Sequence, residues 1–524
     1  MSGYSCARKY QKVSGRSLKA CRQGRIHIGF CYSCYDKFTS DRFIIRRCQT
    51  GVVPIYQLFF HFNLIQPVAI YRKILYTYNK EKYVEQKGCL NNMYKKIIQL
   101  TEDITPELVR QRRDFHKYPE TRWTEMRTAS IIAAKLTELG YEVLIGEQVC
   151  NGEARGNLPS DEVLEQEYQR AIAQGADPKF VEATKGGLTG VIGIMRCGEG
   201  PTVAIRFDID ALKIEESQDP DHFPVQEGFA SVNPGVMHSC GHDGHAASGL
   251  GVAQVLAQIK DQLHGTVKLI FQPGEEAGHG AKTIVDKGHL DDVDFLFGAH
   301  NSMRVDDVDV TPGICGSLAT RRYNVMFKGL SAHAGLSPQK GNNALLAAAT
   351  AVQNLYAIPR HGKGMTRINV GKFISGTSSN VIADEAYMEI EMRGENTELI
   401  EYMDHHSCRI LESAAQMHGC TLNLNLMAYA PSLTCDLPFA EKIDQICKQY
   451  LNLKTTESPA MKANGSDDVA HMIDRVRSHG GMATFMRIHN EQTTGNHNGR
   501  YNLDEEYMSR CAKIFCITAY ELMK

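Results

Sequence analysis

Several features that mark other classes of protein are missing from this chain of 524 residues. It carries little net charge, -2 at pH 7, which argues against general affinity for nucleic acid. The apolar stretch Val52–Tyr71 is interrupted by polar side chains and two prolines, so it is a poor membrane span. The first ten residues have neither the apolar core nor the cleavage site of a secretory signal. We therefore expect a cytoplasmic protein that binds neither nucleic acid nor a membrane.

Disulfide bonding is not indicated, although the sequence contains 16 cysteines. Six of them lie within residues 1–92 and ten are scattered over the rest of the chain. Their positions lack the spacing of a disulfide framework. Because no secretory signal is visible, we interpret the cysteines as reduced thiols.

Charge divides the chain at about residue 92. Residues 1–92 contain 16 Lys and Arg against 4 Asp and Glu, whereas the remainder contains 42 against 56. The first segment is also rich in Cys and Tyr and only weakly periodic. We predict a disordered extension, or sequence that precedes a natural start at Met93. The mixture of basic and aromatic residues also permits a nucleic-acid or membrane role, but the signature of a binding module is not present.

The chain is too long for one compact core, so two or three domains are expected. After Met93, predicted strands and helices alternate, which is typical of an α/β domain with a mostly parallel central sheet. One helix is predicted to begin with Thr105 as N-cap and Pro106 in the first position. Strands are predicted at Tyr141–Leu144, Thr189–Met195, Val203–Asp208, Thr266–Phe271 and Phe295–His300, and helices at Thr128–Leu139, Glu162–Ala173 (within a polar insertion at 151–185), Gly244–Ile259 and Pro438–Leu451.

From about Gly316 the pattern changes to that of a small α+β domain. Strands are predicted at Tyr323–Lys328, Thr366–Phe373, Glu385–Arg393 and Leu422–Met427, and helices at Asn343–Ile358 and Thr397–His418. Alternation of helices and strands resumes afterwards. The sequence thus predicts a catalytic domain in two parts, 93–315 and 431–524, with residues 316–430 inserted between them.

Two short motifs combine metal-binding and acid–base residues. Residues 237–245 read Met-His-Ser-Cys-Gly-His-Asp-Gly-His, and residues 272–276 read Gln-Pro-Gly-Glu-Glu. Cys240 and His242 have the spacing to reach one or two metal ions from a tight turn. A structural zinc site would close with four Cys or His ligands and would not need two neighbouring carboxylates. The pairing with Glu275 and Glu276 therefore favours a catalytic divalent metal site that carries its own general base.

Other side chains near these motifs are candidates for completing the site. Glu275 and Glu276 are consecutive and cannot both face one metal ion, so one should ligate and the other act as base. Four further candidates follow: Asp208 and Asp210, whose carboxylates are suited to orient a metal-bound histidine, and His300 and His497 as additional ligands. His245 either supports a ligand or caps the helix that it begins.

The inserted segment contributes three more candidates. His333 stands in a tight loop, Gly-Leu-Ser-Ala-His-Ala-Gly, at residues 329–335, and Asn380 follows Gly-Thr-Ser-Ser. Either side chain can donate a hydrogen bond to a developing oxyanion or to a substrate carboxylate. Arg393 ends a predicted strand and is suited to bidentate pairing with a carboxylate.

Together these motifs resemble those of the co-catalytic metallopeptidase and amidohydrolase family of aminoacylases, carboxypeptidase G and the plant indole-acetyl-amino-acid hydrolases. The Cys-Gly-His-Asp-Gly-His form is that of the amidohydrolase branch. The resemblance extends from about residue 94 to 524 and is strongest to the members that cleave p-aminobenzoyl-glutamate. The similar stretches are Arg-Arg-Asp-Phe-His at 112–116, Gly-Phe-Ala-Ser-Val-Asn-Pro-Gly-Val-Met-His at 228–238, the polar insertion near 151–185 and Gly-Ser-Asp-Asp at 465–468. Residues 1–92 have no counterpart.

The resemblance implies a role for each candidate. Five residues match the family's ligands for two divalent metal ions, manganese or zinc, with the cysteine bridging them: Cys240, His242, Glu276, His300 and His497. Glu275 matches the general base, and Asp210 matches the carboxylate that supports a metal site. His333, Asn380 and Arg393 match lid-domain positions that contact the substrate, with His333 reaching the site of a neighbouring subunit. The implied fold is a zinc-peptidase-like α/β catalytic domain with an inserted α+β lid and dimerisation domain.

The implied activity is metal-dependent hydrolysis of an amide bond. Cleavage of p-aminobenzoyl-glutamate by metal-activated water would give p-aminobenzoate and glutamate, as in folate catabolism. Other N-acyl or indole-acetyl amino acids, or dipeptides, are the alternative substrates. A non-enzymatic metal- or ligand-binding homologue is a third interpretation, but every catalytic position of the motifs is filled. The expected partners are a small amide with a glutamate-like carboxylate, and either a second copy of the chain through the lid domain or a related B-type subunit.

Overall fold

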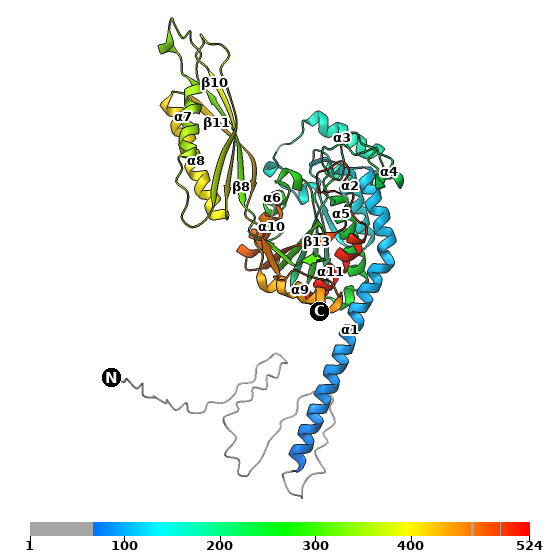
Figure 1. Cartoon of the computed structure of the whole chain (residues 1–524). Coiled ribbons are helices and arrows are strands. Elements are labelled where there is room, and N and C mark those ends of the chain that lie inside the picture. Colours follow the sequence, from blue (N-terminus) through cyan, green and yellow to red (C-terminus); the bar gives the residue numbers. More distant parts are fainter. Residues whose placement is uncertain (1–65, 157, 305–306, 463–465, 493) are drawn as a thin grey trace, which may run out of the picture. The chain divides into compact units, whose positions relative to one another are not determined.

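The computed structural model describes residues 66–524 except 157, 305–306, 463–465 and 493 (Figure 1). The first 65 residues of the predicted N-terminal extension therefore lie outside the described residues. The boundary predicted at residue 92 falls inside a helix, α1 (Gln66–Lys117). No helix within the described part of the chain is long and apolar enough to cross a membrane.

The helix start predicted at Thr105 is wrong. The helix α1 continues without a break through Thr105 and Pro106. Proline inside a helix removes one backbone donor and is normally unfavourable there. The Thr105 hydroxyl donates a hydrogen bond to the Thr101 carbonyl oxygen at 2.9 Å, so its side chain does not cap a new helix. Leu108 and Phe115 of the same helix are buried in the main core. Tertiary packing thus outweighs the local preference of the Thr-Pro pair for a helix start.

The larger domain is built on a seven-stranded sheet with the order β1-β2-β4-β3-β5-β13-β6. The strands are β1 (Glu142–Ile145), β2 (Val191–Arg196), β3 (Thr202–Asp208), β4 (Thr266–Gln272), β5 (Phe295–Met303), β6 (Val310–Thr311) and β13 (Met482–Asn490). The four central strands β4, β3, β5 and β13 run parallel, whereas β1, β2 and β6 are antiparallel to their neighbours. The predicted mostly parallel central sheet is therefore confirmed.

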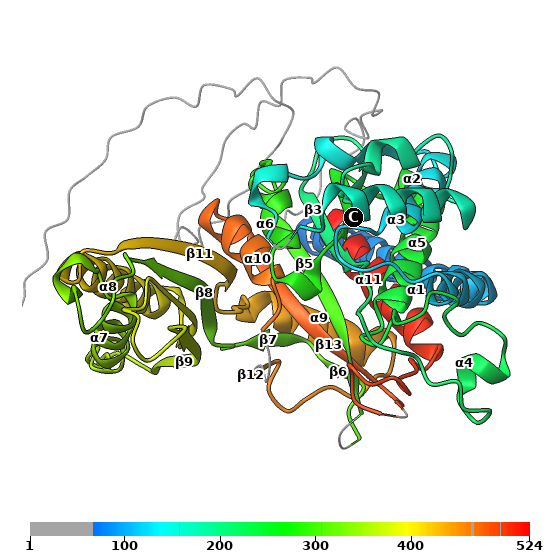
Figure 2. The same ribbon diagram turned by 90° about the horizontal axis from the view of Figure 1, so that it is seen from above.

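Helices surround this sheet (Figure 2). Besides α1 they are α2 (Met126–Glu138), α3 (Asp161–Ala173), α4 (Phe223–Gln226), α5 (His242–Gln258), α6 (Gly280–Val285), α9 (Leu437–Tyr450), α10 (Val469–Ser478) and α11 (Glu506–Met523). The short 3-10 helices are η1 (Gly146–Gln148), η2 (Gly152–Ala154), η3 (Val181–Thr184), η4 (Lys260–Gln262), η5 (Glu275–Ala277) and η6 (Pro338–Lys340), and a small parallel pair joins β7 (Gly313–Cys315) to β12 (Ala460–Lys462). The helices predicted here after Thr105 correspond to α2, α3, α5 and α9, with ends shifted by two residues or fewer.

Side chains of the central strands alternate between two cores. Ile205 and Leu269 belong to the core that contains α5 and α11, whereas Ala204 and Ile270 belong to the core that contains α6 and α10. This alternation follows from the two-residue repeat of a strand. Because both faces are covered, these strands read as continuous apolar runs in the sequence.

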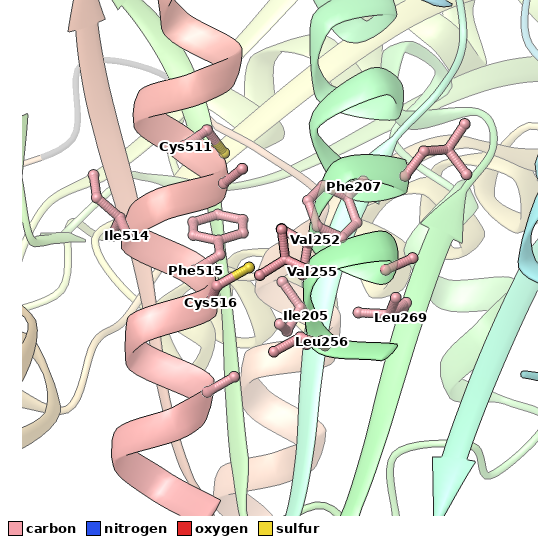
Figure 3. Close-up of a cluster of buried hydrophobic side chains, with 14 of the residues drawn as sticks. Ile205, Phe207, Val252, Val255, Leu256, Leu269, Cys511, Ile514, Phe515 and Cys516 are labelled. Atoms are coloured by element: carbon pink, nitrogen blue, oxygen red, sulfur yellow. The ribbon is translucent and has the colours of Figure 1, made fainter. Parts of the chain in front are cut away.

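The helix α5 lies close against the sheet. Figure 3 shows Val252, Val255 and Leu256 of α5 in one cluster with Phe207 of β3 and with side chains of α11, among them Phe515. A Cβ at Gly249 would come within 2.6 Å of the Phe271 ring, so glycine permits this close approach. Burial of each large apolar side chain in this core contributes about 1.5–3 kcal/mol. The packing holds the first residue of α5 in a constant position relative to the strand ends.

The inserted domain is a four-stranded antiparallel sheet with the order β11-β8-β10-β9 and two helices. Its elements are β8 (Ala319–Lys328), α7 (Ala344–Tyr356), β9 (Thr366–Ser375), β10 (Glu385–Gly394), α8 (Thr397–Met417) and β11 (Thr421–Ala430). Figures 1 and 2 show α7 and α8 along one face of this sheet. The burial of β10 alternates, with Met388, Ile390 and Met392 facing the helices as a core of their own. The predicted α+β insertion is thus present, within residues 316–430.

Candidate metal centre

The candidate site forms where the central strands end. The strands β3, β4 and β5 run parallel, so their carboxyl ends meet at one edge of the sheet. Asp208 ends β3, Glu275 and Glu276 follow β4, and His300 lies in the second half of β5. The helix α5 begins at His242. Residues that are far apart in the sequence therefore converge at this edge.

A left-handed glycine directs the chain into α5. Gly241 has a φ of +86° and directly precedes His242. A Cβ at this position would lie 2.5 Å from Asn301 Nδ2 and 2.6 Å from the Tyr501 hydroxyl oxygen. Glycine is therefore required both by conformation and by space. The turn brings the Cys240 sulfur to 3.4 Å from a ring nitrogen of His300.

Two histidine rings are oriented by hydrogen bonds on the side away from the cluster. The Nδ1 of His242 lies 2.9 Å from the Asp210 carbonyl oxygen and 3.3 Å from its carboxylate. The Nδ1 of His300 lies 2.7 Å from the Asn301 carbonyl oxygen. Donation from Nδ1 makes Nε2 the nitrogen of each ring that can ligate a cation once it is deprotonated. Burial and the neighbouring His245 lower the pKa of His300 well below its usual range, so its ring is neutral.

The turn that carries His497 is attached to the cysteine segment. Its backbone N–H donates to the Ser239 carbonyl oxygen at 2.8 Å. The side-chain amide of Asn496 lies 3.4 Å from the Cys240 sulfur. His497 itself adopts a φ of +64°, which is uncommon for a residue with a side chain. This strained conformation places the ring nitrogen 3.3 Å from a carboxylate oxygen of Glu276.

The five predicted ligands lie in two groups that share the Cys240 sulfur. One group adds His242 and His300, the other adds Glu276 and His497, and the ligand atoms of each group lie within 4.8 Å of one another. Sulfur, imidazole and carboxylate donors suit zinc, and imidazole and carboxylate also suit manganese. The buried Nε2 of His242 has no hydrogen-bond partner among the described residues. These residues therefore fit a bound divalent cation.

His245 supports the cluster and does not ligate. Its Nδ1 lies 2.5 Å from the Asp208 carboxylate, and its Nε2 accepts the backbone N–H of Asn301 at 3.2 Å. The ring lies near His242 in a group with the spacing of a metal site. With one nitrogen donating and the other accepting, however, no lone pair remains for a cation. The interaction joins α5 to β3 and β5 directly behind the ligands.

An ion-pair network beside the cluster was not predicted from the sequence. Arg206 of β3 is fully buried and lies 2.6 Å from Asp208, 3.1 Å from Asp467 and 3.4 Å from Asp468. Gln272 at the end of β4 donates to Asp468 at 2.7 Å. The network connects two strands to the segment before α10. An arginine within the otherwise apolar run of β3 is the sequence signal that points to such a network.

Arg206→Met is expected to lower the free energy of unfolding by about 3 kcal/mol, because it leaves buried carboxylates without their counter-charge. Chemical denaturation of the variant and the parent measures this loss. Arg475→Met is the matched control, since the ion pair of Arg475 with Asp291 lies at the surface and is expected to contribute less than about 1 kcal/mol. Equal losses in the two variants would contradict the importance of the buried network.

Without a bound cation, several ligands hold protons. Burial raises the pKa of the Cys240 thiol to about 12. Burial lowers the pKa of His242, but the charge of Asp208 and the interactions with Cys240 and Asp210 together outweigh it and hold this pKa well above its usual value. The hydrogen bond with Glu276 raises the pKa of His497. Thiols and imidazoles ligate only in their deprotonated forms, so a cation must displace protons when it binds.

The two adjacent glutamates differ in their affinity for a proton. Burial and the charges of Asp467 and Glu276 raise the pKa of Glu275 well above its usual value. Burial also acts to raise the pKa of Glu276, but the hydrogen bond with His497 and the charge of His242 bring it below its usual value. Neighbouring carboxyls with divergent pKa values are suited to different roles, here one ligand and one acid–base group.

The three candidates of the inserted domain lie in two places. His333 and Asn380 lie on neighbouring loops, where the backbone N–H of Ala334 donates to the Asn380 carbonyl oxygen at 2.9 Å. Arg393 lies on β10 and forms an ion pair with Glu391. Over the described ranges of the chain, no hydrogen bond or ion pair joins these three side chains to the metal cluster. Their contacts with substrate stay a prediction.

Asn301 is a further organising residue that the sequence did not reveal. Its side-chain amide donates to the Cys240 carbonyl oxygen at 2.5 Å. Its amide oxygen accepts from the Tyr501 hydroxyl at 2.9 Å and from Gln492 at 2.7 Å. Together with its backbone bond to His245, these contacts join the ligand-bearing segments. The only feature of the sequence that points to Asn301 is its position directly after His300, because its hydrogen-bond partners are all distant in the chain.

This site combines converging strand ends with a cluster of sulfur, imidazole and carboxylate donors and a second carboxyl beside it. Such a site defines the class of metal-dependent hydrolases. Residues 204–521 match the model of peptidase family M20/M25/M40. The chain belongs to this family, and it is a metal-dependent amidohydrolase that acts on amide bonds. The predicted zinc-peptidase-like α/β fold and the predicted reaction class are thereby confirmed.

Known proteins similar to this chain agree with this placement. The indole-3-acetyl-aspartic acid hydrolase of Enterobacter agglomerans is 39% identical over 417 residues, which are 79% of this chain and 96% of that protein. One of the subunits of the p-aminobenzoyl-glutamate hydrolase of Escherichia coli K12 is 38% identical over 426 residues, 80% of this chain and 97% of that protein. Among solved structures, the YXEP protein of Bacillus subtilis, a dinuclear metal-binding peptidase of the M20 family, is 26% identical with a TM-score of 0.57, covering 80% of this chain and 99% of its own. The predicted resemblance to the members that cleave p-aminobenzoyl-glutamate is confirmed.

Proposed function

We propose that this protein hydrolyses the amide bond of p-aminobenzoyl-glutamate and releases p-aminobenzoate and glutamate, as in folate catabolism. The observation that carries the proposal is the position of Glu275 directly beside Glu276 and within the cluster of His242. Hydrolysis by activated water needs a ligand carboxylate and a second carboxyl that is free to move a proton. The choice of substrate is supported by the similarity to the Escherichia coli hydrolase.

Two divalent cations, manganese or zinc, are the proposed cofactors. Their proposed ligands are Cys240, His242, Glu276, His300 and His497. When bound, such cations polarise the substrate carbonyl and acidify a water molecule. The proposed part of Asp210 is to hold the His242 ring through Nδ1, so that Nε2 faces the cation.

Glu275 is the proposed general base. Its carboxylate takes a proton from water as the water oxygen attacks the amide carbon, and it then delivers that proton to the glutamate nitrogen as the carbon–nitrogen bond breaks. His333 and Asn380 are proposed to donate hydrogen bonds to the developing oxyanion or the substrate. Arg393 is proposed to pair with the glutamate carboxylate. Closure of the inserted domain would exclude bulk water during these steps.

The substrate is tested by glutamate release from p-aminobenzoyl-glutamate by the purified chain with manganese or zinc added. Indole-3-acetyl-aspartate and N-acetyl amino acids are assayed in parallel, since the relative from Enterobacter agglomerans is named for the first of these. Metal-dependent release of glutamate is the expected result. Turnover of the other amides alone would reject p-aminobenzoyl-glutamate and keep the mechanism. If the metal-loaded chain cleaves none of these amides, the proposal that this chain is active by itself, without a second type of polypeptide, is rejected.

The proposal includes assembly through the inserted domain. The strand β9 lies at the edge of its sheet, and Phe373 and Ile374 near its end are 41% and 57% exposed. An apolar edge strand is a ready site for pairing with another chain. The proposed partner is a second copy, which would supply His333 to the neighbouring site. A related B-type subunit is the alternative, suggested by the name of the Escherichia coli relative, which describes it as one of the subunits of its hydrolase.

Ile374→Lys is expected to convert a dimer into a monomer, because a charge on an edge strand opposes pairing. Light scattering of the purified full chain measures the mass. Ile172→Lys is the matched control, since Ile172 is 46% exposed on α3 of the larger domain and should leave the mass unchanged. A parent chain that is monomeric at all concentrations would contradict assembly of the chain with itself.

A further inference from the structure

Two buried carboxylates hold the turn that carries the adjacent glutamates. The Glu125 carboxylate accepts the backbone N–H of Gly274 at 2.8 Å, just before Glu275. The Asp210 carboxylate accepts the backbone N–H of Glu276 at 3.0 Å, just after Glu275. The Pro273–Gly274 peptide group before Glu275 and the Glu275–Glu276 peptide group after it are therefore each held by a side chain from another part of the chain. Of these two carboxylates, the one of Glu125 has no place in the ligand groups or in the proposed mechanism.

Glu125 does not perform the usual task of its position. It is the N-cap residue of α2, where a side chain normally accepts a hydrogen bond from the first turn of the helix, but it forms no such bond. Glu120 does this instead, with its two carboxylate oxygens accepting the backbone N–H groups of Arg127 and Thr128 at 2.9 and 2.8 Å. The Glu125 side chain is thus free to point away from its own helix and toward the turn.

The carboxyl of Glu125 is held on its other side as well. It is completely buried, and its second oxygen accepts the Thr189 hydroxyl at 2.7 Å. Thr189 is also buried. A buried carboxyl with both oxygens engaged has a single orientation, so it can define the direction of the Gly274 N–H.

A buried aromatic ring supports the same turn. Gly274 has a φ of +59°, and a Cβ on it would lie 3.2 Å from the Trp123 ring. Trp123 is completely buried and has a φ of +64°, a conformation that is unfavourable for a bulky residue. Its ring nitrogen donates to the Gly156 carbonyl oxygen at 2.9 Å. Strain of this kind persists where the surrounding structure requires it.

We propose that Glu125 is a positioning residue which, through the Gly274 N–H, directs Glu275 toward the reacting atoms and Glu276 toward the metal. The proposal rests on the proposed function for the part played by Glu275. Consecutive glutamates have to point in different directions, and the direction of each depends on the peptide planes of residues 274–276. Loss of the bond at Gly274 leaves the turn held by Asp210 and by the Gly280 N–H, which donates to the Gly274 carbonyl oxygen at 3.2 Å. The Gly274 N–H then has no fixed direction, so the backbone that leads into Glu275 is less constrained.

Three substitutions of Glu125 separate position from charge and size. Glu125→Gln keeps an oxygen for the Gly274 N–H and places an amide against the Thr189 hydroxyl, so it should retain activity. Glu125→Ala removes the acceptor. Glu125→Asp keeps the carboxyl group but is one methylene shorter and does not reach. Glu120→Ala is the matched control, because the Glu120 side chain is buried as well and binds the first turn of α2 but has no bond to the turn at Gly274.

The expected result is a kcat about 10- to 100-fold lower for the Ala and Asp variants, with KM little changed, and near-parental values for the Gln variant. Binding of Zn²⁺ or Mn²⁺ alone, measured by calorimetry, should weaken in the Ala and Asp variants only. Trp123 is the single tryptophan of the chain, so its emission should shift in the same two variants. Glu120→Ala should lower the unfolding temperature without changing the kcat of the folded protein.

Three outcomes would overturn the proposal: parental kcat and metal binding in a folded Glu125→Ala, a Glu120→Ala that loses as much kcat, or an Asp variant as active as the Gln variant. If Glu125→Ala fails to fold, the Asp and Gln variants decide between the two results. If the parent cleaves no amide, the proposed function fails, while calorimetry and Trp123 emission still report whether Glu125 positions the turn.

Discussion

Glu275→Gln is expected to lower kcat by about 10²- to 10⁴-fold, the usual loss when a general base is removed. Glutamine has nearly the same size but cannot accept a proton from water. Glu275 lies near His242 and Glu276 but is proposed as the base and not as one of the five ligands, so the metal content and KM should change little. Steady-state kinetics on the cleaved amide, with metal analysis of the same sample, measures these quantities.

Glu276→Gln is the matched control for this substitution. The two residues are adjacent, and the chemical change is the same. Because Glu276 lies with Cys240 and His497 in one ligand group, its substitution should lower the metal content as well as the rate. A Glu275→Gln variant that keeps its kcat, or one that loses metal as Glu276→Gln does, would contradict the assignment of Glu275 as base.

The pH profile gives the same assignment an independent check. Burial and the charges of Asp467 and Glu276 raise the pKa of Glu275. Below that pKa the carboxyl is protonated and cannot accept a proton, so kcat should fall as the pH falls through it. A bound cation favours the charged form and moves this limb toward lower pH. The residual activity of Glu275→Gln should lack the limb.

Removal of the metal is expected to abolish activity, and addition of the metal should restore it. A chelator removes the metal from the parent protein, and His242→Ala removes one proposed ligand. The Nε2 of His242 is buried without a hydrogen-bond partner among the described residues, which suits a ligand atom. His405→Ala is the control, since His405 is exposed on α8. A metal concentration 100 times the dissociation constant should also stabilise the fold by about 2.7 kcal/mol. Full activity of the metal-free parent would contradict the assignment.

Metal binding should become tighter as the pH rises. The pKa values of His242 and Cys240 are raised without metal, to about 12 for the thiol, so both groups carry protons at neutral pH. A cation binds their deprotonated forms, and each proton that must leave weakens binding at low pH. Calorimetry in two buffers of different ionisation enthalpy counts the released protons. Release of none would contradict the raised pKa values.

The elements next to the site were predicted well because their signals are local. The helix α5 follows a glycine turn and carries small apolar residues, and β4 is a run of apolar residues before Pro273. The donor types of the two motifs favoured a metal site, and the resemblance to the family supplied the five proposed ligands. Their roles stay proposals, although the structure brings all five together.

The predictions failed where distant residues compete with a local signal. Thr105 and Pro106 have the pattern of a helix start, but α1 continues because its apolar face packs against the core. For His245 the sequence left two roles open, support of a ligand or a helix cap, and its contacts with Asp208 and Asn301 are those of a supporting residue. At Thr105 a residue's neighbours in space override what its neighbours in the chain indicate.

Residue order was enough to predict an α/β catalytic domain with an inserted α+β domain and a site of sulfur, imidazole and carboxylate donors, because periodicity and donor chemistry are properties of short segments. The choice of Glu275 as base came from the resemblance to the family and stays a proposal. Only the tertiary structure showed which residues hold the site in place. Arg206 pairs with three aspartates, Asn301 binds the cysteine turn and Glu125 binds Gly274. Glu125 and Gly274 are 149 residues apart, and such a bond forms only when the start of α2 lies against the turn that follows β4. Hydrogen bonds and buried charges depend on which groups the folded chain excludes from water, and no short segment contains that information.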